Sequence, residues 1–442
     1  MIPLKSFKLG KRVKGYIIAS VISILVLIIL ITKTVLSRLH ENSTDIVLII
    51  VFIVLSSIFI YKSVEEVIKC IVVLAKRGYI DINIDEDLEE LIDDDVILLK
   101  GPKIVVIGGG TGLSTMLRGL KNYTSNITAI VTVGDDGGGS GVLREDLGIL
   151  PPGDIRNCIL ALARTEPLME ELLQYRFKDG RLKNQNFGNL FLAAMDGISD
   201  NFEDAVQKMS SVLAVKGKVL PVTLEDMVLE VELENGNKVR GESIIGEEVI
   251  EQDSRIKKLK IFPEDAKALD DAISAIEDAD AIVLGPGSLY TSILPNLLVK
   301  DITRSIKKSK ALKLYICNIM TQPGETQKFS VSDHIKVIFD HCGRDIIDCV
   351  IANEESIHPD LRDKYYAEGS DIVNLDIEEL EKLGVDVVKD NLTETQKTYV
   401  RHNAQKLAKI IIETVMERKM LYDRNKILEY IYLCKKIKTR DN

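Results

Sequence analysis

The chain has 442 residues, a net charge of −10 and a pI near 5.3, which is long enough for two or three domains. The acidic balance excludes an extended nucleic-acid surface, because such surfaces gather Lys and Arg and raise the pI. The mean hydropathy of +0.09 is high for a chain with 28% charged residues, and the N-terminus accounts for the excess.

Two uncharged apolar stretches, residues 16–32 and 46–61, predict membrane spans at the short end of the required length of about 17–25 residues. A cleaved signal peptide is disfavoured because the second stretch follows the first directly. The flanking cations are Lys5, Lys8, Lys11, Arg12 and Lys14 before the first stretch, Lys33 and Arg38 between the two, and Lys62, Lys69, Lys76 and Arg77 after the second. The positive-inside rule therefore predicts a multi-pass cell-membrane protein with its main domain in the cytoplasm. A buried helical hairpin is the alternative.

Four regions are expected along the chain. Residues 1–80 are a membrane hairpin and juxtamembrane helix, 81–97 an acidic linker, 98–415 a nucleotide-binding domain, and 416–442 a helical tail. The linker is dominated by Asp and Glu, which predicts a solvated, self-repelling segment; a docking site for a basic partner is the alternative. The six cysteines form no C-x-x-C pair, as is typical of a reducing compartment.

Strands and helices alternate from residue 103 onward. Strands are predicted at 103–107, 128–133, 281–284, 311–317 and 348–352, and helices at 114–121, 154–164, 167–176, 187–197, 266–277 and 332–340. This order predicts an α/β fold with a parallel sheet and helices on both faces. Residues 218–262 instead alternate apolar and polar side chains around Asn235-Gly236, which predicts an inserted β-rich subdomain with a hairpin.

Two glycine loops follow predicted strands. "VVIGGGTGLS" contains Gly108, Gly109, Gly110, Thr111 and Gly112, and "LGPGSLYTS" contains Gly285, Pro286, Gly287 and Ser288. Such loops let backbone N–H groups approach a phosphate at a helix N-terminus. The first loop fits neither the G-x-G-x-x-G fingerprint nor a P-loop, and a tight structural turn is the alternative. Since carboxyl ends of parallel strands meet in one crevice, we expect these two loops and the glycine-rich loop at residues 134–141 to converge.

The second strand ends in "VGDDGGGSGVLRE". Its carboxylates, Asp135 and Asp136, are candidates for a ribose hydroxyl or for Mg²⁺. Ser140 and Arg144 are candidate anion ligands, since arginine binds phosphate bidentately. An ordinary surface turn is the alternative.

Two further helix starts carry candidate ligands. In "PPGDIRN", Asp154 is predicted as a helix N-cap, followed by Arg156 and Asn157; a cation is unfavourable there, so Arg156 suggests an anion or a salt bridge. In "NFGNL", Asn186 and Asn189 cap the helix or bind ligand hydroxyls.

Six blocks together resemble the gluconeogenesis factor family: "VVIGGGTGLSTMLRGL", "ITAIVTVGDDGGGSGVLRE", "PPGDIRN", "FGNL", "LGPGSLYTSILPNLL" and "YICNIMTQPGET". The resemblance covers residues 100–415 and extends to 2-phospho-L-lactate transferase, a relative of that family. It implies a Rossmann-like, three-layer domain that binds UDP-N-acetylglucosamine. It also implies a role in cell shape and envelope precursor supply on gluconeogenic carbon, with a protein partner in that synthesis and a homo-oligomeric state.

The resemblance also implies that Tyr365 and Arg401 lie near the uridine and its pyrophosphate. In the transferase relatives, the matching glycine loop and Asp-Asp segment serve a guanine nucleotide, Mg²⁺ and the phospholactate donor. Here "PPGDIRN" replaces the second aspartate-rich block of the transferases, which argues against the transfer chemistry.

Three hypotheses follow. The chain is a membrane-anchored nucleotide-sugar-binding protein without a reaction of its own, a phosphotransferase using Asp135 and Asp136 with Mg²⁺, or an NAD-binding protein. The first is favoured, because no histidine has a recognisable general-base partner and the glycine fingerprint is imperfect.

Overall fold

A computed structural model describes residues 50–51, 53–54, 57–58, 60–62, 98–99, 101–164, 167–355, 357–396 and 399–420. The first predicted span, half of the second, nearly all of the juxtamembrane helix, the whole linker and most of the C-terminal tail lie outside these ranges. Within them, no helix combines the length and the apolar character needed to cross a bilayer. The folded unit described below is Ile92–Lys419.

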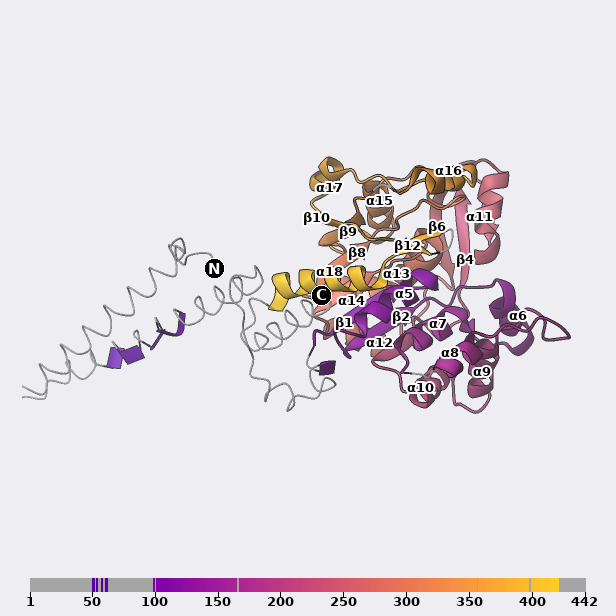
Figure 1. Cartoon of the computed structure of the whole chain (residues 1–442), viewed down its shortest axis with the longest axis horizontal. Coiled ribbons are helices and arrows are strands. Elements are labelled where there is room, and N and C mark those ends of the chain that lie inside the picture. The colour runs from indigo at the N-terminus through magenta and orange to yellow at the C-terminus, as the bar shows by residue number, and fades with distance from the viewer. Residues whose placement is uncertain are drawn as a thin grey trace, which may run out of the picture. The chain divides into compact units, whose positions relative to one another are not determined.

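A seven-stranded parallel sheet runs through this unit in the order β10-β9-β8-β7-β1-β2-β3 (Figure 1). Its strands are β1 (Ile104–Gly108), β2 (Ile127–Val131), β3 (Lys218–Pro221), β7 (Ala281–Leu284), β8 (Leu312–Ile316), β9 (Cys349–Asn353) and β10 (Asp386–Asp390). Every residue of β1, β7 and β8 is buried, as expected for a parallel sheet with both faces covered. The predicted α/β fold is confirmed.

Right-handed connections place helices on both faces. One layer holds α5 (Gly110–Leu120), α6 (Gly138–Leu147), α7 (Pro152–Leu162), α8 (Pro167–Gln174), α9 (Phe187–Asp196), α10 (Phe202–Val212) and α18 (Ala404–Val415). The other holds α12 (Asp270–Glu277), α13 (Leu294–Leu298), α14 (Lys300–Lys308), α15 (Val331–Cys342), α16 (Pro359–Ala367) and α17 (Ile377–Leu383). The three layers match the expectation.

Helices α5 and α18 lie side by side (Figure 1). Their closest approach is at Gly119, where a Cβ atom would lie 2.1 Å from the Ala404 carbonyl oxygen and 2.8 Å from the Ala408 Cβ. Only a glycine lets the two backbones approach so closely.

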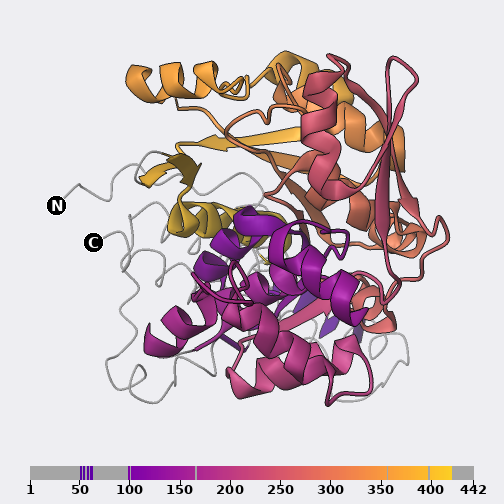
Figure 2. The same cartoon turned by 90° about the vertical axis from the view of Figure 1, so that its right-hand side faces the viewer.

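The insertion is a three-stranded antiparallel sheet in the order β5-β4-β6 with one helix against it (Figure 2). Its elements are β4 (Val228–Leu233), β5 (Lys238–Arg240), α11 (Glu242–Glu251) and β6 (Ile256–Phe262). The predicted hairpin at Asn235-Gly236 is confirmed, since β4 pairs with β5 and Gly236 has a φ of +89°. The predicted start of the insertion differs: Lys218–Pro221 pairs with β2 as the edge strand β3 of the main sheet.

The direction of strand order reverses between β1 and β7. Chain connections run from β1 toward β2 on one side and from β7 toward β8 on the other. Ligands bind α/β sheets at such a switch point, outside the carboxyl ends of the strands. The loops after β1 and β7 are the two glycine loops singled out from the sequence.

Candidate functional site

A cavity of about 310 Å³ opens at this switch point. Its walls come from four segments that are far apart in the chain: the start of α5, the loop after β7, the loop after β8, and the hairpin strand β12 (Tyr399–His402). The lining residues are Gly109, Gly110, Thr111, Gly112, Thr115, Pro286, Gly287, Ser288, Ser292, Asn318, Ile319, Met320, Gln322, Val400, Arg401 and His402. The expected convergence is therefore observed for the loops after β1 and β7, whereas the glycine-rich loop at residues 134–141 contributes no residue to the lining.

The two loops are in direct backbone contact. A Cβ atom on Gly112 would lie 2.9 Å from the Pro286 carbonyl oxygen, and one on Gly287 would lie 3.2 Å from the Gly109 carbonyl oxygen. Gly110, the first residue of α5, has a φ of +71°. Side chains would separate the loops or strain the turn, so the glycines are required for the cavity to exist in this form.

Helix α5 begins at the cavity, and its own sequence supplies neither a side-chain cap nor a carboxylate to its N-terminus. Gly109 supplies no side-chain cap, and the first turn contains no acidic residue. The unpaired N–H groups of a first turn and the helix dipole favour an anion at such a position. This end of the cavity suits a phosphate or pyrophosphate.

A polar wall comes from the loop after β8. Asn318 Nδ2 donates to the Gly287 carbonyl oxygen at 2.9 Å, and Gln322 Nε2 donates to Ser288 Oγ at 2.6 Å. Asn318 Nδ2 is also 3.4 Å from Gln322 Oε1. These bonds fix the second glycine loop against β8. Sequence reasoning missed both residues as site residues, although "YICNIMTQPGET" was one of the six blocks.

The opposite wall is β12, which pairs with β11 (Thr393–Gln396). The Arg401 side chain is exposed and lines the cavity, while His402 is buried beside it. Burial lowers the pKa of His402 to about 4, so its ring is neutral at pH 7. His402 Nε2 lies 3.2 Å from the Cys317 carbonyl oxygen and is therefore the protonated nitrogen.

Tyr365 does not line the cavity. It is 9% exposed and packs with Ile319 and Val400. Its hydroxyl oxygen accepts a hydrogen bond from the Val400 N–H at 2.8 Å. The residue supports the strand that carries Arg401, which differs from the stacking position that the resemblance implied.

Asp154 is hydrogen-bonded to the first glycine loop. It lies inside the first turn of α7, whose N-cap is Pro151, so the predicted N-cap role is wrong. Its Oδ2 instead accepts a hydrogen bond from Gly110 N at 2.7 Å. The pKa of Asp154 is raised to about 6, chiefly by burial and also by the charge of Asp135, while the bond from Gly110 and the charge of Arg156 oppose the shift.

Two more carboxyl groups near Asp154 have raised pKa values. Burial raises the pKa of Glu242 to about 8, with Asp135 and Asp136 adding to the shift, and burial raises the pKa of Glu325 to about 7. Glu325 Oε2 accepts from Tyr290 N at 3.3 Å. The side of the site that faces the insertion is therefore acidic.

The Asp135–Asp136 pair accepts hydrogen bonds from backbone N–H groups. Both oxygens of Asp136 accept bonds from the first N–H groups of α11, those of Glu242 at 3.0 Å and Ser243 at 2.8 Å. Asp135 Oδ1 accepts from Gly137 N at 2.9 Å. In the described parts of the chain, no group of three or more His, Cys, Asp or Glu side chains is placed to hold a metal ion.

Other predicted ligands also lie outside the cavity. Arg144 forms an ion pair of 2.5 Å with Asp226 and donates to the Met227 carbonyl oxygen at 2.9 Å, which ties α6 to the insertion. Asn186 caps α9 through the Asn189 N–H at 3.1 Å. The remaining predicted residues outside the lining are Gly108, Asp135, Asp136, Ser140, Arg156, Asn157 and Gly285. The cavity thus gathers eight of the predicted residues: Gly109, Gly110, Thr111, Gly112, Pro286, Gly287, Ser288 and Arg401.

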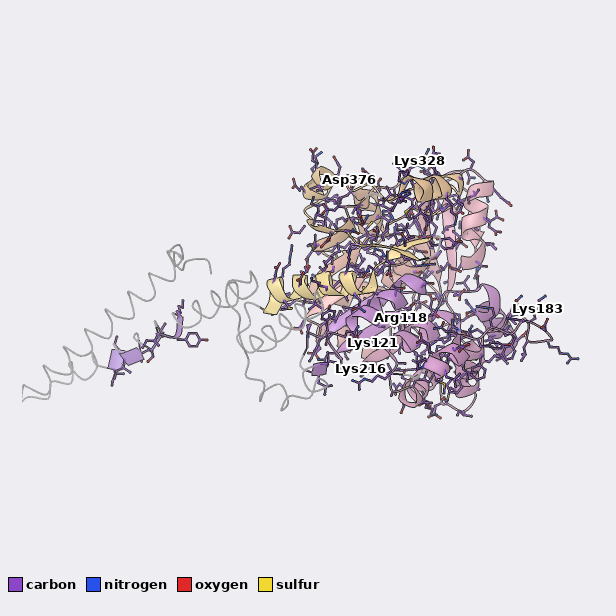
Figure 3. The ribbon with its side chains drawn as sticks, viewed as in Figure 1. Arg118, Lys121, Lys183, Lys216, Lys328 and Asp376 are labelled. Atoms are coloured by element: carbon purple, nitrogen blue, oxygen red, sulfur yellow. The ribbon has the colours of Figure 1, made fainter. Side chains whose placement is uncertain are left out.

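Cations gather at the other end of α5, one helix length from the cavity. Arg118, Lys121 and Lys216 are labelled there in Figure 3. Lys121 Nζ donates to the Ala163 carbonyl oxygen at 2.9 Å, and burial, followed by the charge of Arg118, lowers the pKa of Lys121. Arg118 pairs with Glu170 at 2.8 Å. Substitution of Arg118 therefore serves as a control for substitutions of the arginines near the cavity.

Known proteins resemble this chain over most of the domain described above. The family model for 2-phospho-L-lactate transferase CofD matches residues 104–393. A protein of Clostridium acetobutylicum is 59% identical over 390 residues, which cover 88% of this chain and 86% of that protein. The gluconeogenesis factor of Bacillus subtilis is 48% identical over 317 residues, covering 72% of this chain and 99% of its own length. A crystal structure of a Bacillus halodurans protein is 48% identical with a TM-score of 0.67, covering 70% of this chain and 98% of that one.

Proposed function

The chain belongs to the gluconeogenesis factor family, whose domain matches that of 2-phospho-L-lactate transferase CofD, and on this premise we propose that it binds UDP-N-acetylglucosamine in the cavity. The observation that carries the proposal is one arrangement: two contacting glycine loops, the glycine-rich N-terminus of α5 and the exposed Arg401 line the same cavity.

The chemistry of a nucleotide sugar fits these walls. The pyrophosphate lies against the N-terminus of α5, where backbone N–H groups and the helix dipole favour negative charge. Arg401 supplies a cation at the same ligand. Thr115, Ser292, Asn318 and Gln322 offer hydroxyl and amide groups to the sugar. A volume of about 310 Å³ is at the lower end of ligand pockets, roughly 300–1,000 Å³.

The proposed cellular role follows from the family and from the sequence. The chain senses or holds the nucleotide sugar, an envelope precursor, and supports cell morphogenesis on gluconeogenic carbon. Its two uncharged N-terminal stretches anchor it to the cell membrane, with the domain on the cytoplasmic side. A protein partner in envelope precursor synthesis recognises the form of the chain that has the nucleotide sugar bound.

Isothermal titration calorimetry on the full chain tests the ligand. We expect UDP-N-acetylglucosamine to bind more tightly than UDP, GDP with Mg²⁺, or NAD. UDP-glucose is the matched control, since it lacks only the acetamido group. Tighter binding of NAD than of any UDP-sugar would refute the proposal.

A second candidate function is transfer of a phosphorus-containing group. It is favoured by the match to the CofD family model and by two carboxyl groups with raised pKa values, that of Asp154 at the glycine loop and that of Glu242 at the start of α11. A raised pKa suits a carboxyl group to proton transfer near neutral pH. Turnover of a GDP- or UDP-activated donor with Mg²⁺, lost in Glu242→Gln, would favour this candidate over binding alone.

A further inference from the structure

Arg156 is a buried cation whose charge the nearby Asp154 carboxylate offsets only in part. It is 8% exposed, and its Nη2 donates to the neutral Asn157 Oδ1 at 2.8 Å. No carboxylate forms an ion pair with it in the part of the chain that the structure describes, and its Nε atom is buried with no hydrogen-bond partner. The pKa of Arg156 is lowered to about 10, chiefly by burial and then by the charge of Arg176, while the charge of Asp154 opposes the shift. Burying an unpaired charge is costly, so this arrangement calls for an anion.

Two other side chains near Arg156 are also incompletely bonded. Gln185 is 8% exposed and Asn189 is 4% exposed, and the Oε1 of the first and the Oδ1 of the second are buried without partners. Native proteins pair nearly all buried polar atoms with protein, water or an ion. One such donor and two such acceptors, carried by residues of α7 and α9 and of the turn before α9, are open to a bound group that both accepts and donates.

The three side chains lie where helices α6, α7 and α9 begin. The Arg156 side chain crosses the start of α9, because a Cβ atom on Gly188 would lie 2.6 Å from Arg156 Cδ. Gln185 Oε1 faces the start of α6, 3.1 Å from the position of a Cβ on Gly139. Neither α6 nor α7 has a side-chain cap. Their dipoles add to the positive potential around Arg156.

We propose that Arg156, Gln185 and Asn189 form a second oxyanion subsite, distinct from the cavity, that takes a hydrogen phosphate or phosphomonoester group. Phosphate oxygens accept from Arg156 Nε, and the single P–O–H group of hydrogen phosphate donates to one of the two amide oxygens. Sulfate matches the charge but carries no proton at neutral pH, so it satisfies Arg156 and leaves the amide oxygens unpaired. The subsite does not depend on which nucleotide sugar occupies the cavity.

Thermal unfolding of the full chain in phosphate tests the proposal, with chloride at equal ionic strength as reference. We expect phosphate to raise the melting temperature with a saturable dose dependence, and sulfate to need at least tenfold higher concentration. Arg156→Met should shift the phosphate dependence at least tenfold. Arg118→Met, which removes an arginine one helix length from the cavity, should leave it unchanged.

Gln185→Glu is a second variant with little change in shape. Its carboxylate supplies a further counter-charge, so the variant should melt at a higher temperature than the parent without phosphate and should lose the response to phosphate. An equal phosphate response in the parent, Arg156→Met and Gln185→Glu would overturn the subsite and indicate that phosphate binds in the glycine loops. A parent chain that binds UDP-N-acetylglucosamine but gains no stability from phosphate would overturn the subsite alone.

Discussion

The Tyr365 hydroxyl oxygen accepts a hydrogen bond from the backbone N–H of Val400, 2.8 Å away, and Val400 directly precedes Arg401. Tyr365→Phe leaves that buried N–H unpaired, which costs about 1–3 kcal/mol of folding free energy. We expect lower stability in urea and weaker UDP-N-acetylglucosamine binding, because β12 loses a support. Tyr366→Phe, at a residue that is 74% exposed, should change neither. If Tyr365 acted by stacking its ring on the base, the Phe variant would keep full affinity.

Arg401→Ala should weaken UDP-N-acetylglucosamine binding about tenfold or more, because a hydrogen bond to a charged group contributes roughly 1.5–3 kcal/mol. Arg401→Lys keeps the charge without the planar fork and should give an intermediate affinity. Calorimetry measures both, with Arg118→Ala as the control. Affinity that is unchanged in Arg401→Ala would remove this residue from the site.

Asp154→Asn should stabilise the fold at high pH. The folded-state pKa of about 6 lies above the ordinary value of 3.8, so ionised Asp154 destabilises the fold as the pH rises from about 4 through 6. The penalty at pH 8 is on the order of 3 kcal/mol. The asparagine oxygen still accepts from Gly110 N and carries no charge. Urea unfolding should show a gain at pH 8 that disappears at pH 4; Asp179→Asn, at an exposed position, is the control.

The same substitution should tighten ligand binding at pH 8 in EDTA, because it removes a negative charge beside the loop that holds the pyrophosphate. Weaker binding in Asp154→Asn would contradict this placement of the phosphates.

Gly287→Ala should weaken UDP-N-acetylglucosamine binding while the protein stays folded. Its Cβ atom would lie 3.1 Å from Ser292 Cβ and 3.2 Å from the Gly109 carbonyl oxygen, so the two loops must separate slightly. Gly197→Ala, where the nearest atom would be 3.6 Å away, is the matched control. Circular dichroism separates the two explanations: unfolding in Gly287→Ala would mean that the loop is only a structural turn.

Carbonate extraction of membranes tests the two predicted spans. The full chain should stay in the membrane pellet, whereas a chain that begins at Val96 should be released. Full-length protein in the wash would refute the spans at residues 16–32 and 46–61.

The sequence predicted those parts of the site that depend on local pattern. Glycines placed after apolar strands identified both loops, and the order of strands predicted that the loops would meet. Asn318 and Gln322 were missed because their bonds reach Gly287 and Ser288, more than thirty positions earlier in the chain. Nothing in the spacing of "YICNIMTQPG" indicates those partners.

Long-range bonds also explain where the structure differs from the sequence-based predictions. Asp136 and Arg144 are residue types that bind metals and phosphates, but here they hold the insertion to the main domain through Glu242, Ser243 and Asp226. Aspartate is a common N-cap residue, yet the Asp154 side chain accepts its hydrogen bond from Gly110, on another helix. Residue type predicted a polar role in each case, and only the fold determined the partner.

The packing of Gly119 against Ala404 has a consequence for natural variation. Helix α5 starts at one wall of the cavity, and α18 begins two residues after His402 of the opposite wall. The contact between Gly119 and Ala404, which lies outside the cavity, therefore sets the distance between the two walls. A relative with a larger residue at position 119 must carry a compensating change near position 404 or hold a cavity of different width. Such relatives are therefore expected to prefer ligands of a different size, even where the residues that contact the ligand are the same.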